Sequence, residues 1–177
     1  MAFLVRKLIK RDNLPILNEI KDVGELNADI PTAEFRTKDG TLSTWIIDSL
    51  KKINDAVLAI AVTSSEITKM DVIIIDTELL SKNELTYQQT YAGQDIAIPD
   101  LQDSHYDILG VSIKKLVNCT QVYQEIVKND PDEEKYIIRL AAGEIKDLLK
   151  KAIEEDRIDE SRASKKLKAE IDKLKAG

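Results

Sequence analysis

The feature that most constrains the fold is a run of four aliphatic residues, Val72 to Ile75, enclosed by Asp71 and Asp76. No polar residue interrupts the run, so an extended segment here would be apolar on both faces. A short apolar run bounded by acidic residues is typical of a strand that is covered on both sides. The sequence therefore predicts a central strand of a sheet at 71–76.

The segment before this strand predicts an amphipathic helix over 49–63. Asp48 or Ser49 is a candidate N-cap, because both side chains can accept hydrogen bonds from the first free amides of a helix. We expect this helix to cover one face of the central strand. Its apolar positions recur at spacings of three and four, at Leu50, Ile53, Val57, Ile60 and Ala61.

Residues 33–37 and 42–46 predict a β-hairpin. Both runs are rich in β-branched and aromatic residues, and they flank Asp39-Gly40, a dipeptide favoured in two-residue turns. A tight register would collect the apolar groups on one side, whereas a looser loop with Gly40 as a bulge would scatter them. We expect the tight register.

The N-terminal half as a whole predicts a small α+β layer. Residues 2–9 form another strand, apolar on both sides, and residues 10–32 form a connection with about one helical turn. With a further helical turn at 78–83, the order over 1–83 is β-β-β-α-β. This order suits a mixed or antiparallel sheet.

The stretch 84–101 shows no period and contains Tyr87 and Tyr91. Long segments without periodicity are usually either functional or mobile. We interpret this stretch as a linker or flap that separates the α+β layer from a helical half.

Residues 102–177 predict a helical hairpin followed by a short C-terminal helix. A long helix over 103–129 follows from apolar residues at alternating spacings of three and four. Asp130, Pro131 and Glu133 then match a capping box for a second helix, which the short connection makes antiparallel to the first.

The second helix loses its apolar stripe near 156–159, where we expect it to break. The remaining tail, 160–177, keeps a narrow stripe that includes Leu167, Ile171 and Leu174. An isolated helix of this length is marginal in water. We expect the tail to dock on the protein's own helical pair, with docking on a partner as the second possibility.

Composition excludes several classes of protein. A net charge of -6 disfavours a general surface for nucleic acid or anionic membrane. Cys119 is the only cysteine, so neither an internal disulfide nor a thiolate metal cluster can form, which fits a reducing cytoplasm. Residues 1–9 are too short and too charged for a signal sequence, and no apolar run approaches the ~20 residues of a membrane span. We expect a soluble, cytoplasmic protein.

Few residues suggest chemistry. His105, the only histidine, could serve as a base or ligand, but polarity at a helix start is the simpler interpretation. Cys119 lies in an apolar segment and should behave as a small hydrophobe. Asp76 directly follows the buried strand, where metal-binding acids often lie, with Asp48 and Glu78 as the nearest possible second acids. A polar strand terminator is again the simpler interpretation.

The recognised catalytic motifs are missing. The sequence contains no phosphate-binding glycine-rich loop, no Gly-x-Ser-x-Gly elbow, no His-Glu-x-x-His pattern and no Cys-x-x-Cys pair. The tail lysines Lys165, Lys166 and Lys168 could contact phosphates, but Glu170 and Asp172 lie among them. A solvated helix face is the expected result.

Three short segments carry a resemblance to a known group of proteins. Met1-Ala2-Phe3-Leu4-Val5-Arg6-Lys7, Leu42-Ser43-Thr44-Trp45 and Asp55-Ala56-Val57-Leu58-Ala59 resemble a family of short bacterial proteins of unknown function. The resemblance lies in the first half of the chain and implies no activity and no catalytic residue.

These observations favour a non-catalytic interaction protein of regulatory, accessory or immunity type, which binds another protein and uses no cofactor or metal. One alternative is a metal-dependent hydrolase or nuclease that uses Asp76, and another is a nucleic-acid binder that uses the basic tail. The candidate partner-binding residues are Tyr87, Tyr91, Leu167, Ile171 and Leu174.

Overall fold

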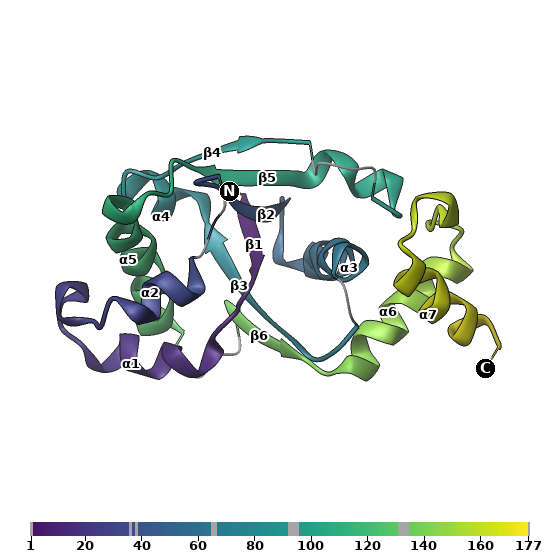
Figure 1. Ribbon diagram of the computed structural model, residues 1–177, viewed down its shortest axis with the longest axis horizontal. Coiled ribbons are helices and arrows are strands. Elements are labelled where there is room, and N and C mark those ends of the chain that lie inside the picture. Colours follow the sequence, from purple (N-terminus) through teal and green to yellow (C-terminus); the bar gives the residue numbers. More distant parts are fainter. Residues whose placement is uncertain are drawn as a thin grey trace.

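The structure is a computed structural model that describes residues 2–35, 37, 39–64, 67–91, 96–130 and 135–176. Over these residues the chain forms a six-stranded antiparallel sheet with helices on both faces (Figure 1), which confirms the α+β class. The strands lie across the sheet in the order β4-β5-β2-β1-β3-β6. They are β1 (Phe3–Lys7), β2 (Leu42–Ile47), β3 (Met70–Asp76), β4 (Thr86–Gln89), β5 (His105–Leu109) and β6 (Ile137–Leu140).

The predicted central strand is confirmed as β3. It pairs with β1 on one edge and β6 on the other. Val72 and Ile74 belong to the core on one face of the sheet, whereas Ile73 and Ile75 belong to the core on the opposite face. The four central positions, Val72 to Ile75, are all apolar because both faces of the strand are covered there.

The helices divide between the two faces of the sheet. Figure 1 shows α1, α2, α4 and α5 on one side and α3, α6 and α7 on the other. The helices are α1 (Leu14–Glu19), α2 (Asp29–Glu34), α3 (Ile53–Thr63), α4 (Thr77–Lys82), α5 (Ile113–Asn129), α6 (Ala142–Glu154) and α7 (Lys165–Ala176). The helical turn predicted at 78–83 is confirmed as α4.

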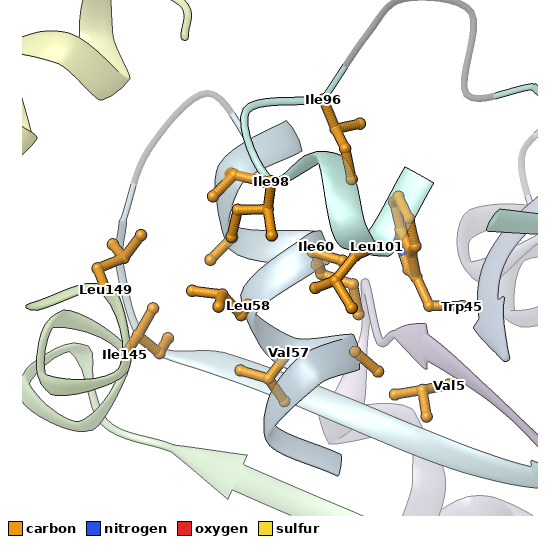
Figure 2. Close-up of a cluster of buried hydrophobic side chains, with 14 of the residues drawn as sticks. Val5, Trp45, Val57, Leu58, Ile60, Ile96, Ile98, Leu101, Ile145 and Leu149 are labelled. Carbon is orange, nitrogen blue, oxygen red and sulfur yellow. The ribbon is translucent and has the colours of Figure 1, made fainter. Parts of the chain in front are cut away.

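Helix α3 covers the central strands, as its periodicity predicts. Figure 2 shows Val57, Leu58 and Ile60 of α3 in one apolar cluster with Val5 of β1 and Ile145 of α6. The expected caps are absent. The side chain of Ser49 makes no capping hydrogen bond, and Asp48 accepts a hydrogen bond from Lys52 Nζ at 2.8 Å instead.

The predicted hairpin is wrong. Its first arm overlaps α2, and both edges of β2 are occupied by β1 and β5 rather than by residues 33–37. Gly40 still forms a turn, with a φ of +70° that glycine adopts without strain. Two members of the expected hairpin, Arg36 and Lys38, lie outside the described residues.

Hydrogen bonds of the buried residue Glu34 hold α2 against the end of β1. Glu34 Oε2 accepts hydrogen bonds from the amides of Ile9 and Lys10, each at 2.9 Å, and Arg6 donates to the Glu34 carbonyl oxygen at 3.1 Å. Burial raises the pKa of Glu34, although these amides and the Arg6 charge act in the opposite direction. The connection over 10–32 is therefore more helical and better anchored than one turn.

The long helix predicted over 103–129 is correct only from Ile113 onward. Residues His105–Leu109 form β5, which pairs with β2 on one edge and β4 on the other. Gly110 then turns the chain with a φ of +65°. The spacing of apolar residues fitted a helix, but the free hydrogen-bonding edges of two strands make the extended form more stable here.

The helix predicted to start at Pro131 is also wrong in its first turns. Residues 131–134 lie outside the described part of the chain, Ile137–Leu140 form β6 on the edge of β3, and α6 starts at Ala142. Asp130 does not begin a helix. Its carboxylate accepts hydrogen bonds from the amides of Lys135, Tyr136 and Ile137. The capping glutamate is Glu144, which accepts from the Ala141 amide at 2.7 Å.

The predicted antiparallel pair of long helices does not form. Helix α5 packs with α1 and α2 on one face of the sheet, and α6 packs with α3 and α7 on the other. The stretch 84–101 contains β4 and the buried residues Ile96, Ala97 and Ile98, while residues 92–95 are not described. Strands from both sides of this stretch pair with one another, because β5 joins β2 and β6 joins β3.

Candidate functional site

Strand β4 is an edge strand with one open side. It pairs only with β5 among the described residues, in a register that places Gln88 opposite Asp107. The Thr90 amide donates to the His105 carbonyl oxygen at 3.1 Å, which makes Thr90 and His105 a hydrogen-bonded pair. Antiparallel pairing alternates, so the main-chain groups of Tyr87 and Gln89 point away from the sheet. Figure 1 shows β4 along the outer border of the sheet.

Among the described residues, the short strand β4 lacks a charged side chain or proline that would block its open edge. Exposed edge strands are normally blocked by charged side chains, proline or bulges. Thr86, Tyr87, Gln88 and Gln89 have no charge and include no proline. The opposite border differs, because β6 carries Arg139, whose guanidinium binds Asp71 at 2.8 Å. Strand β4 is therefore the border that is better suited to pairing with another strand.

Two of the predicted partner-binding residues lie on or beside this edge. Tyr87 is half-buried, and its ring lies 6.0 Å from that of Tyr106. Tyr91 follows the strand and is 63% exposed. The edge thus combines unpaired main-chain groups with an aromatic surface on one face.

A network of polar side chains links the end of β4 to the neighbouring strand β5. The Thr90 hydroxyl donates to Asp107 Oδ2 at 3.0 Å and lies 2.9 Å from His105 Nδ1. A hydroxyl has one proton, so His105 Nδ1 is the donor in the second bond. His105 is buried against the Trp45 ring, with 5.0 Å between the ring centroids. The histidine lies in a strand rather than at a helix start, and its side chain is bound to Thr90 beside the end of β4.

Asp76 lies at a second feature, a cleft at the far end of β3. Its Oδ1 accepts a hydrogen bond from the Glu78 amide at 2.9 Å, so the side chain caps α4. The cleft has a volume of about 360 Å³. It is lined by Ile74, Asp76, Leu79, Ile126, Asn129, Lys135 and Tyr136.

The cleft has a charged rim and an apolar floor. The Lys135 ammonium lies 4.6 Å from the centroid of the Tyr136 ring. A side-chain interaction with Tyr136 is the main cause that raises the pKa of Lys135. Ile74, Leu79 and Ile126 supply the apolar lining. The sequence pointed to Asp76 but gave no sign of Lys135 and Tyr136, because only the β3–β6 pairing brings them beside it.

One of the two acids proposed to join Asp76 at a metal site, Asp48, is engaged elsewhere. Asp48 has a side chain that is 69% exposed and is bound to Lys52. Among the described residues, no three His, Cys, Asp or Glu side chains are grouped so that they could hold a metal ion.

The tail residues lie against the protein's own core. Leu167 and Ile171 are buried with residues of α3 and α6, and Leu174 is partly buried beside them. This confirms that the tail docks on the protein itself, although the surface that receives it is α6 rather than the helix over 103–129. A partner could reach Leu167 or Ile171 only if α7 left α6.

The charges of the tail are largely balanced by acids. Glu170 binds Lys146 at 2.9 Å and Lys173 at 3.3 Å, and Glu160 binds Lys175. Lys165, Lys166 and Lys168 lie on the exposed side of α7. The tail therefore mixes both signs of charge on its surface, as its sequence predicts.

Cys119 is buried on α5, and burial raises its pKa to about 11. Only the thiolate is strongly nucleophilic, so this thiol is inert at neutral pH.

Comparison of the chain with protein-family models, with curated proteins and with solved structures found no match. In the described ranges, no helix is both long enough and apolar enough to cross a membrane.

Proposed function

We propose that this protein is a non-catalytic binding module that receives an extended segment of a partner protein along the open edge of β4. The observation that carries the proposal is the uncharged edge itself, with the outward main-chain groups of Tyr87 and Gln89. Addition of a strand to a sheet edge is a recurrent mode of peptide recognition, in which main-chain hydrogen bonds supply affinity.

Side chains around the edge define the partner further. Tyr87 and Tyr106 present aromatic surface on one face, and aromatic residues are enriched where binding energy concentrates. The net charge of -6 opposes an acidic partner. The expected partner segment is therefore extended, neutral or basic, and rich in residues that favour strands.

The cellular setting completes the proposal. The single buried cysteine fits a reducing cytoplasm, and the sequence resemblance points to a bacterial source. A regulatory or accessory role follows from binding without chemistry.

The test compares two substitutions at one position. Gln89→Pro removes the outward amide, whereas Gln89→Ala keeps the amide and removes the same side-chain bond to the Asp103 carbonyl oxygen. Proline is tolerated where the amide faces away from the sheet. Losing one hydrogen bond costs about 1 kcal/mol, and the proline ring also obstructs the incoming strand, so affinity should fall about tenfold or more.

Each tagged variant is used for affinity purification from the native host, with nuclease treatment and with identification of the proteins that co-purify. The proposal expects a partner that is retained by the unchanged protein and by Gln89→Ala but lost by Gln89→Pro, at equal melting temperatures. Equal retention of the partner by both variants would overturn it.

A further inference from the structure

The cleft beside Asp76 has opposite charges that do not meet. Asp76 uses Oδ1 as the cap of α4, and no other interaction of this side chain occurs among the described residues. The Lys135 ammonium faces the Tyr136 ring, and the charge of Asp130 acts on it without forming an ion pair. Asp76 and Lys135 nevertheless line the same cleft. A carboxylate and an ammonium held apart in this way leave each charge available to a ligand that carries both signs.

The rest of the lining restricts the ligand. Part of the floor is aliphatic: Ile126 is almost fully buried and Leu79 packs in the same core, while Ile74, from the core on the other face of the sheet, borders the cleft. Asn129, the last residue of α5, adds an amide at the rim, and the carbonyl end of a helix favours a positive group. A volume of about 360 Å³ is at the lower end of the range for small-molecule sites.

We propose that this cleft binds a small zwitterion with an apolar body, of the free amino acid type. Its ammonium is placed between Asp76 and the carbonyl end of α5, its carboxylate meets Lys135, and its apolar side chain lies against Leu79 and Ile126. The site is separate from the β4 edge, because β3 and β6 lie at the other end of the sheet order. Binding of an amino acid in this cleft can therefore be tested independently of partner binding at the β4 edge.

The probes are L-leucine, L-leucinamide and 4-methylpentanoic acid, titrated into the full chain and followed by calorimetry and by NMR shifts. The amide lacks the carboxylate, and the acid lacks the ammonium. We expect saturable binding of leucine at millimolar concentration or below, and affinities lower by about tenfold or more for the other two probes. Absence of saturable leucine binding, or equal affinities for all three, would overturn the proposal.

Two variants locate the site. Asp76→Asn keeps a good N-cap but removes the charge that the ammonium needs, so leucine binding should weaken by about tenfold or more without loss of fold. Lys135→Gln should weaken leucine binding to a similar degree, with little effect on leucinamide. Leucine affinity that is unchanged in Asp76→Asn, at an unchanged melting temperature, would place any binding elsewhere and refute the assignment.

Discussion

Replacement of Ile171 by alanine tests whether α7 is part of the protein's own core. Ile171 is fully buried in the cluster that contains Ile145 and Leu149 of α6. Truncating a buried isoleucine to alanine loses transfer free energy and leaves a cavity, which together cost about 2–5 kcal/mol. For a chain of this size, this loss lowers the melting temperature by roughly 4–20 °C.

The matched control is Ile16→Ala on α1. It removes the same atoms from a side chain that is 37% exposed, so its effect should stay within about 0.5 kcal/mol. Chemical and thermal unfolding, followed by circular dichroism, measure both variants. Removal of residues 160–177 should lower the melting temperature as well. If Ile171→Ala loses no more stability than Ile16→Ala, then α7 contributes nothing to stability and does not dock on α6.

Four further predictions concern Cys119, Asp71, Asp76 and helix α7. At pH 8, the Cys119 thiol of the folded protein should react with a thiol reagent about a hundredfold more slowly than in denaturant, because burial raises its pKa from 9.0 to about 11. Equal reaction rates in the folded and denatured protein would contradict the burial of Cys119. Burial alone would raise the pKa of Asp71, but hydrogen bonds from Arg139 and Arg11 outweigh burial and lower it. The stability that ionised Asp71 adds is therefore fully present above its ordinary pKa of 3.8 and is lost as the pH falls through its pKa in the folded protein. The Asp71→Asn variant should be less stable at pH 7. Its free energy of unfolding should also decrease less than that of the unchanged protein as the pH is lowered. Calorimetry with Mg²⁺ or Mn²⁺ at millimolar concentration should show no site that depends on Asp76, and an isotherm abolished by Asp76→Asn would support the hydrolase alternative instead. Duplex DNA or RNA should not bind measurably to α7 at physiological salt, and a tight complex that weakens steeply with salt would favour the nucleic-acid alternative.

Part of the candidate sites could be read directly from the sequence. Tyr87 and Tyr91 stood out as aromatic residues in a segment without periodicity, and they lie on or beside the open edge. Asp76 stood out because it follows a buried strand. The residues that complete its cleft, Asn129 and Lys135, lie more than fifty positions away in the chain. No local sequence pattern predicts that these residues lie near Asp76, because their proximity depends on which strand pairs with β3.

The sequence by itself determined the elements whose environment is apolar all along their length or on one regular face. Strand β3 was predicted without knowledge of its neighbours, since a short run of four aliphatic residues between two acids is typical of a strand covered on both faces. Helix α3 followed from apolar residues at helical spacing, although the structure buries every residue from Ala56 to Val62 and not one face alone. In these segments the local sequence pattern favours the same secondary structure as the tertiary packing, so the type of element can be predicted without knowing its neighbours.

Only the tertiary structure decided the state of 105–109 and 137–140. Both segments have apolar residues at spacings that also suit a helix, and their intrinsic preferences differ too little to choose between the two forms. The choice comes from the main-chain groups of β2, β4 and β3, which lack partners until these segments extend beside them. The same pairing separates α5 from α6 by placing them on opposite faces of one sheet. Hydrogen bonds between residues far apart in the chain, rather than local propensity, therefore turn two segments of the expected helical half into strands of the sheet.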